Sequence, residues 1–113
     1  MRWKALGRLK SGQMNKTEAR YAQTLEQLKR DGKIKQYWFE GITMKLADGL
    51  RYTPDFLVLT DKDELEAHEV KGARAIFRDD AKAKVKTAAE YFPFRMKVIY
   101  PIKGGIGWEV EDY

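Results

Sequence analysis

The chain has 113 residues, enough for one domain with a single core that needs no covalent staples. It contains no cysteine, which excludes disulfide bonds and thiolate metal sites, and no apolar run approaches the roughly 18 residues that span a bilayer. Lys and Arg number 22 against 17 Asp and Glu, so the formal net charge of +5 favours a polyanionic partner. We expect a soluble, cytoplasmic protein with no membrane partner.

Basic residues precede the first acidic residue, Glu18, and make the start of the chain strongly positive. We predict residues 1–12 as a basic, flexible arm and residues 13–113 as a single folded domain. Contact with phosphate groups is the functional interpretation of the arm. A solvated leader without a partner is the alternative.

The first predicted helix covers residues 19–30. Residues 15–18 offer caps before it, and Asp31-Gly32 supplies a stop. Its apolar residues recur at helical spacing and are Ala22, Leu25 and Leu28. Glu18 stands four residues before Ala22, so a carboxylate is expected on the side of the helix that faces the core.

Three strand segments are predicted next, over residues 34–46, 50–59 and 65–71, with a bend or bulge near Gly41 and a turn at Asp48-Gly49. They predict a hairpin-rich sheet of three strands.

A second helix is predicted from Asp79 to Phe92, where Pro93 stops it. Alternating residues then predict a strand over 94–100 and a last strand around 108–110. The order of elements is helix, three strands, helix, strand, which indicates an α/β domain.

Two neighbouring strand segments carry charged residues that hydrophobic packing does not require. Asp55 lies in one, and Glu69 and Lys71 lie two apart in the next, so these two share a face and Val70 points the opposite way. Two carboxylates beside a lysine suit a divalent cation and a charged phosphate. The set therefore indicates a nuclease. The alternative is that Glu69 and Lys71 are ordinary solvent-facing residues of a half-exposed sheet.

The sequence Pro54-Asp55, followed after thirteen residues by Glu69-Val70-Lys71, resembles the signature of the PD-(D/E)XK superfamily of metal-dependent nucleases. The resemblance covers residues 15–100 and is greatest to short phage-encoded members, including Holliday-junction resolvases. It implies a restriction-endonuclease-like α/β core in α-β-β-β-α-β order. The core would have a mixed central sheet of about four to five strands flanked by helices.

The same resemblance implies that Asp55, Glu69 and the Val70 carbonyl group bind one or two Mg²⁺ ions, which Mn²⁺ would replace. Lys71 would orient the attacking water or stabilise charge on the phosphate. The implied activity is that of a DNA endonuclease acting on branched or structured DNA such as four-way junctions. A homodimer in a bacterial or phage-infected cell is implied as well.

Glu18 has two interpretations that the sequence leaves open. Many members of the superfamily carry a glutamate on the helix before the catalytic strands, and Glu18 matches this position, which would make it a further catalytic residue and metal ligand. Alternatively, Glu18 closes a capping arrangement with Asn15 and benefits from the helix dipole.

Basic residues outside the signature are expected to contact nucleic acid: Arg2, Lys4, Arg8, Lys10, Arg74, Arg78, Lys82 and Lys86. Lys82 and Lys86 lie four apart on the second predicted helix, where a solvated face balanced by acidic residues explains them equally well. His68, the only histidine, faces away from Glu69 and Lys71 by strand parity and is expected to be structural.

Two other functions are also consistent with the sequence. One is a non-catalytic nucleic-acid-binding module of the same fold, which would use the basic arm and the lysine-rich helix for affinity. The other is a nuclease that acts on free ends or on RNA with the same site. The retention of Asp55, Glu69 and Lys71 favours an enzyme over the binding module.

Overall fold

The structure is a computed structural model that describes residues 12–77 and 79–113. The predicted DNA contacts Arg2, Lys4, Arg8, Lys10 and Arg78 lie outside the described residues, as does the predicted arm apart from Gly12.

The described part of the chain forms two α-helices, a short 3-10 helix and seven strands. In chain order they are α1 (Lys16–Arg30), β1 (Ile34–Phe39), β2 (Met44–Ala47), β3 (Leu50–Tyr52), β4 (Phe56–Thr60), β5 (Leu65–Val70), η1 (Arg74–Ile76), α2 (Asp79–Tyr91), β6 (Arg95–Pro101) and β7 (Trp108–Asp112). Among the helices within residues 12–77 and 79–113, none has both the length and the apolar character needed to cross a membrane.

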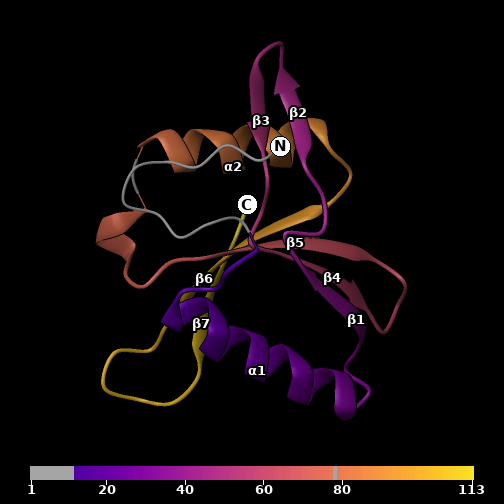
Figure 1. Ribbon diagram of the computed structural model, residues 1–113, viewed down its shortest axis with the longest axis vertical. Helices are drawn as coiled ribbons and strands as arrows, with labels where there is room; N and C mark the ends of the chain where they lie inside the picture. The colour runs from indigo at the N-terminus through magenta and orange to yellow at the C-terminus, as the bar shows by residue number, and fades with distance from the viewer. Residues whose placement is uncertain (1–11, 78) are drawn as a thin grey trace.

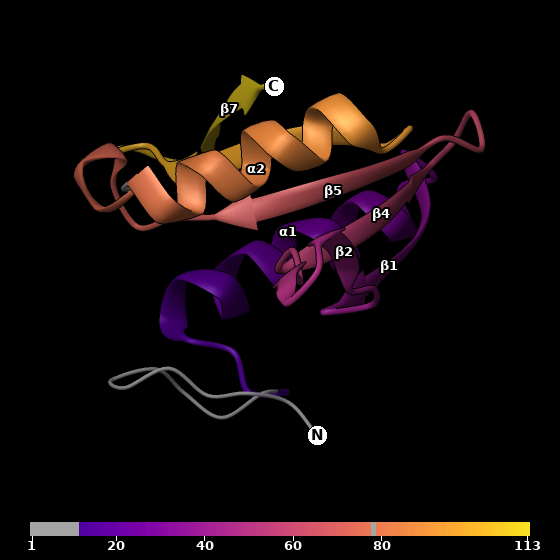
Figure 2. The same cartoon turned by 90° about the horizontal axis from the view of Figure 1, so that it is seen from above.

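Five of the strands form one sheet in the order β1-β4-β5-β6-β7. Strands β5 and β6 are parallel and are joined through α2, whereas the other neighbours are antiparallel. Helices α1 and α2 cover opposite faces of this sheet (Figures 1 and 2). The predicted α/β fold with a mixed sheet of four to five strands between helices is therefore confirmed.

Helix α1 begins at a complete capping box, in which the Asn15 side chain accepts from the Glu18 N–H and the Glu18 side chain accepts from the Asn15 N–H. The helix buries Glu18, Tyr21 and Leu25 against the sheet, and the rings of Tyr21 and Phe56 meet edge to face at 5.6 Å. The predicted apolar face was correct at Leu25. The centre of the buried face is displaced from the prediction, because Tyr21 is buried more fully than Ala22.

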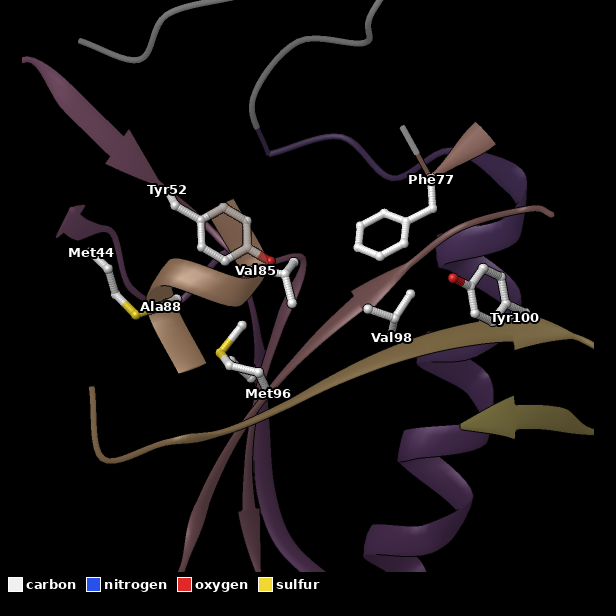
Figure 3. Close-up of a cluster of buried hydrophobic side chains, with 9 residues drawn as sticks. Met44, Tyr52, Phe77, Val85, Ala88, Met96, Val98 and Tyr100 are labelled. Carbon is white, nitrogen blue, oxygen red and sulfur yellow. The ribbon is translucent and has the colours of Figure 1, made fainter. Parts of the chain in front are cut away.

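The opposite face of the sheet packs against α2 through Val85 and Ala88, which are fully buried. Figure 3 shows this core cluster, whose buried members are Met44, Tyr52, Ala67, Phe77, Val85, Ala88, Met96, Val98 and Tyr100. Met44 and Tyr52 come from β2 and β3, so the cluster includes a part of the chain outside the main sheet.

The predicted three-strand sheet is wrong, because the segments predicted over 34–46 and 50–59 each divide into two strands. Strands β2 and β3 then form a separate two-stranded sheet. The segment predicted as one bent strand over 34–46 divides at Glu40, which has φ of 52°. A Cβ atom on Gly41 would lie 2.8 Å from the Cβ of Trp38, so the sharp turn there requires glycine. The β2–β3 hairpin consequently projects away from the main sheet (Figure 1).

Candidate active site

The three residues of the sequence signature lie together where β4 begins and β5 ends. Phe56 is paired with His68 across the antiparallel strands, so Asp55 and Glu69, the next residues along, face each other. Lys71 follows β5 directly, and its backbone N–H donates to the carbonyl oxygen of Ile99 at 2.9 Å. The pairing of β5 with β4 and β6 therefore determines the position of all three residues.

Asp55 is a buried carboxyl group with a 5% exposed surface. Its Oδ2 accepts a hydrogen bond from the backbone N–H of Val70 at 2.8 Å. Burial raises the pKa of Asp55 well above its ordinary value, and the negative charges of Glu69 and Glu18 raise this pKa further, against the opposing effect of the Val70 N–H.

Glu69 is also buried, and each of its carboxylate oxygens has one donor. The hydroxyl group of Tyr52 donates to Oε1 at 2.7 Å, and the Nζ of Lys71 lies 3.1 Å from Oε2. Burial and the nearby charge of Glu69 raise the pKa of Tyr52 well above its ordinary value. The alternative interpretation, in which Glu69 is an ordinary solvent-facing residue, is therefore wrong, because Glu69 is 7% exposed.

Sequence reasoning missed Tyr52 as a member of this site. No spacing rule brings a residue of β3 to a carboxylate of β5, because the two strands belong to different sheets. One signal was available, since a buried tyrosine hydroxyl needs a hydrogen-bond partner.

Glu18 takes part in both of the arrangements that the sequence had left open. Its Oε1 accepts from the backbone N–H of Asn15 at 2.8 Å and closes the capping box. It is also buried, with 8% of its surface exposed, and lies near enough to Asp55 for its negative charge to raise the pKa of that residue. The fold therefore brings a third carboxylate to Asp55 and Glu69.

The chemistry of these donors fits a hard divalent cation, because carboxylate oxygens are the ligands that Mg²⁺ and Mn²⁺ prefer. Within residues 12–77 and 79–113, however, no group of three or more His, Cys, Asp or Glu side chains stands in an arrangement that could hold a metal ion. Glu69 is oriented by Tyr52 and Lys71, and Glu18 by its helix cap. The backbone nevertheless brings these carboxylates close enough for their charges to interact, and side-chain torsions change more easily than the fold.

His68 lies on the other face of β5 from Glu69, as strand parity predicted. Its Nδ1 is 2.7 Å from the hydroxyl oxygen of Tyr21, and its Nε2 is 2.9 Å from Oε1 of Glu66. The hydrogen bond with His68 lowers the pKa of Glu66. This buried network links α1 to β5 and agrees with a structural role for His68.

The predicted DNA-contacting residues within the described ranges are all exposed, but Arg74 also forms ion pairs. Lys82 and Lys86 are exposed on α2. Arg74 is exposed but engaged, because its guanidinium group lies 3.0 Å from a carboxylate oxygen of Glu109 and 2.7 Å from one of Glu111. It also lies 4.5 Å from the centre of the Tyr100 ring, so it joins η1 to the outer strands.

Fold and site together define an α/β protein with buried carboxylates and a lysine gathered at one end of two central strands. Comparison of the chain with protein-family models, with curated proteins and with solved structures finds no match. The function must therefore be argued from the residues of this chain and their geometry.

Proposed function

We propose that this protein is a metal-dependent DNA endonuclease that hydrolyses phosphodiester bonds in branched or structured DNA. The observation that carries the proposal is the burial of Asp55 beside Glu69 and Glu18, with Lys71 paired to Glu69. An α/β fold alone is compatible with many other functions, so these residues and their geometry carry the functional information.

Electrostatics favour a functional reason for the cluster. Burying ionised carboxylates is costly, and the cost is greater when like charges lie close together. The fold compensates Glu69 with Tyr52 and Lys71, but the pKa of Asp55 remains raised despite the Val70 N–H. Unfavourably placed titratable groups of this kind occur most often at functional sites.

The order of elements supports a restriction-endonuclease-like core of the PD-(D/E)XK type. If the β2–β3 hairpin is treated as an insertion, the remaining elements up to β6 follow the order α-β-β-β-α-β. In this proposal, the central pair β4 and β5 carries the acidic residues, as the superfamily resemblance implies.

Asp55 and Glu69, with Glu18 and the Val70 carbonyl group, would hold Mg²⁺ or Mn²⁺. The bound cation would supply Lewis acidity and positive charge at the scissile phosphate. Lys71, whose side chain is 24% exposed, keeps its ammonium group at the edge of the site, where a phosphate can reach it. It would donate hydrogen bonds to the phosphate or orient the attacking water, and so stabilise the charge that develops during hydrolysis.

The basic character of the chain supports DNA as the substrate. The net charge is +5, and Lys82 and Lys86 are exposed on α2. A small domain has little surface for reading bases, so recognition of DNA shape and backbone suits it better than a sequence code. Action on junctions as a homodimer is part of the proposal because two active sites would then meet two strands.

The test is cleavage of a labelled four-way junction in Mg²⁺, compared with linear duplex, single-stranded DNA and RNA. An excess of EDTA should abolish product formation, and Lys71→Ala should reduce kcat by about 10²–10³-fold while DNA binding is kept. Lys35→Ala is the matched control, because Lys35 pairs with Asp63 away from the site.

Equal cutting of every DNA form would keep the nuclease and remove the preference for junctions. Cutting of RNA in preference to DNA would change the substrate class. Binding of DNA without cutting in Mg²⁺ or Mn²⁺ would refute the enzyme and leave the non-catalytic binding module.

A further inference from the structure

We propose that Tyr52 is a positioning residue of this site, whose hydroxyl group orients Glu69 for the cation and couples the β2–β3 hairpin to the reaction. The inference rests on the proposed function and extends it to a residue outside the sequence signature. Tyr52 acts through Glu69 and does not itself contact the substrate.

Glu69 is held by one hydrogen-bond donor on each carboxylate oxygen. Tyr52 is 7% exposed, and its hydroxyl group donates to Oε1 at 2.7 Å, while Lys71 lies 3.1 Å from Oε2. Two donors on the two oxygens set the plane of the carboxylate. Each oxygen retains lone pairs for a cation, since a carboxylate has about four acceptor positions.

The two donors to Glu69 differ in charge. A tyrosine hydroxyl adds no charge, so it orients Glu69 without neutralising it, whereas the ammonium group of Lys71 is needed at the phosphate. The ring of Tyr52 is held in the core cluster, where rotation about its torsions is restricted (Figure 3). Such hydrogen bonds to metal ligands typically change metal affinity or activity by about 10–100-fold when they are removed.

Tyr52 belongs to the β2–β3 hairpin and not to the main sheet that carries Glu69. Tyr52 is the last residue of β3 and is paired with Met44 of β2, and both pack in the same cluster as Val85 and Ala88 of α2. The hairpin projects from the body of the protein beyond this point (Figure 1). A displacement of the hairpin therefore moves the donor that orients Glu69.

The test compares Tyr52→Phe with the matched variant Tyr37→Phe. Tyr37 also donates its hydroxyl hydrogen to a glutamate, Glu26, at 2.8 Å, but it lies on β1 and pairs with α1. Mn²⁺ affinity is measured by calorimetry without DNA, and kcat and KM are measured on the junction. Tyr52→Phe should weaken Mn²⁺ binding by about 10–100-fold and lower kcat with KM for DNA unchanged, while Tyr37→Phe alters none of them.

Equal Mn²⁺ affinities and equal kcat values for the two variants would overturn the role of Tyr52 and leave the proposed nuclease intact. Absence of both Mn²⁺ binding and cleavage in the unaltered protein would overturn the proposed function together with this inference. Thermal unfolding of each variant shows whether it is folded. If Tyr52→Phe unfolds, the Mn²⁺ calorimetry and the kinetics are repeated in trimethylamine N-oxide, which favours the compact state. The outcomes are then interpreted in the same way.

Discussion

The carboxylate of Glu69 lies close enough to Asp55 for its charge to raise the pKa of Asp55. The closeness follows from the register of β4 and β5, in which Phe56 opposes His68 and the next residues face one another. Neither residue contributes to the apolar core, yet both are buried. The protein thus gathers at one defined point two carboxyl groups whose simultaneous ionisation is unfavourable.

Asp55→Asn should stabilise the fold and abolish cleavage. A raised pKa in the folded state means that the ionised form of Asp55 costs stability at neutral pH. Asparagine removes the charge, and its carbonyl oxygen can still accept from the Val70 N–H. We expect a gain on the order of 1 kcal/mol, or roughly 5 °C in Tm, when both proteins are unfolded in EDTA.

Mg²⁺ provides the control for this prediction. It should raise the Tm of the unaltered protein, because a ligand that binds only the folded state stabilises it, and it should have little effect on Asp55→Asn. A lower Tm for Asp55→Asn in EDTA would show that the carboxylate pair is favourable and would remove the electrostatic argument.

Metal affinity should increase with pH over a range that begins above the ordinary pKa of aspartate. Because the pKa of Asp55 is raised, a proton occupies the carboxyl group at pH values where an exposed aspartate is already ionised. The proton competes with the cation, so lowering the pH weakens binding, and binding releases protons. Calorimetry in two buffers of different ionisation enthalpy, at one acidic and one mildly alkaline pH, measures this release. Equal proton release at both pH values would contradict the prediction.

Glu18→Gln should separate the two roles of Glu18. Glutamine can accept the Asn15 N–H and keep the capping box, but it is a poor ligand for Mg²⁺. We therefore expect unchanged thermal stability with Mn²⁺ affinity reduced at least tenfold, on the order of 1.4 kcal/mol of binding free energy. Glu18→Ala is the comparison, since it should lose stability as well, by about 1 kcal/mol. Unaltered Mn²⁺ affinity in Glu18→Gln would assign the residue to the helix cap alone.

Lys82→Ala with Lys86→Ala should weaken DNA binding and reduce its dependence on salt. Each phosphate contact contributes about 0.9 to the slope of log affinity against log salt, so the double variant should lower the slope by roughly 1.8. Lys29→Ala with Lys33→Ala has the same change of charge, and both residues are exposed, Lys29 in the last turn of α1 and Lys33 just after it. Equal slopes for the two double variants would mean that α2 does not contact DNA and that the lysines only solvate its face.

Elements with strong local signals were predicted well. The second helix was expected from Asp79 to Phe92 and is observed over Asp79–Tyr91, and the strand expected over 65–71 is observed over Leu65–Val70. The capping residues of α1 were recognised, although the helix starts at Lys16. These features depend on hydrogen bonds and apolar spacing within a few residues, so the sequence contains the information directly.

Features that depend on distant residues were not predictable in the same way. The β2–β3 hairpin separates from the main sheet because of a turn at Glu40 and Gly41, and the bonds of Tyr52 to Glu69 and of Tyr21 to His68 join segments far apart in the chain. Arg74 was expected to contact DNA, and its pairing with Glu109 and Glu111 appears only in the folded chain.

The sequence by itself determined the α/β class, the bounds of α2 and β5 to within a residue, and the face of β5 on which Glu69 lies, because these depend on periods of 3.6 and 2 residues. Only the tertiary structure decided that Glu18 lies near enough to Asp55 to raise its pKa and that the hydroxyl group of Tyr52 donates to Glu69. These contacts depend jointly on the strand register, the packing of α1 on the sheet and the turn before the hairpin. No local sequence pattern specifies the resulting distances. The chemistry of the site is thus encoded in residue types, and its electrostatics are produced by packing.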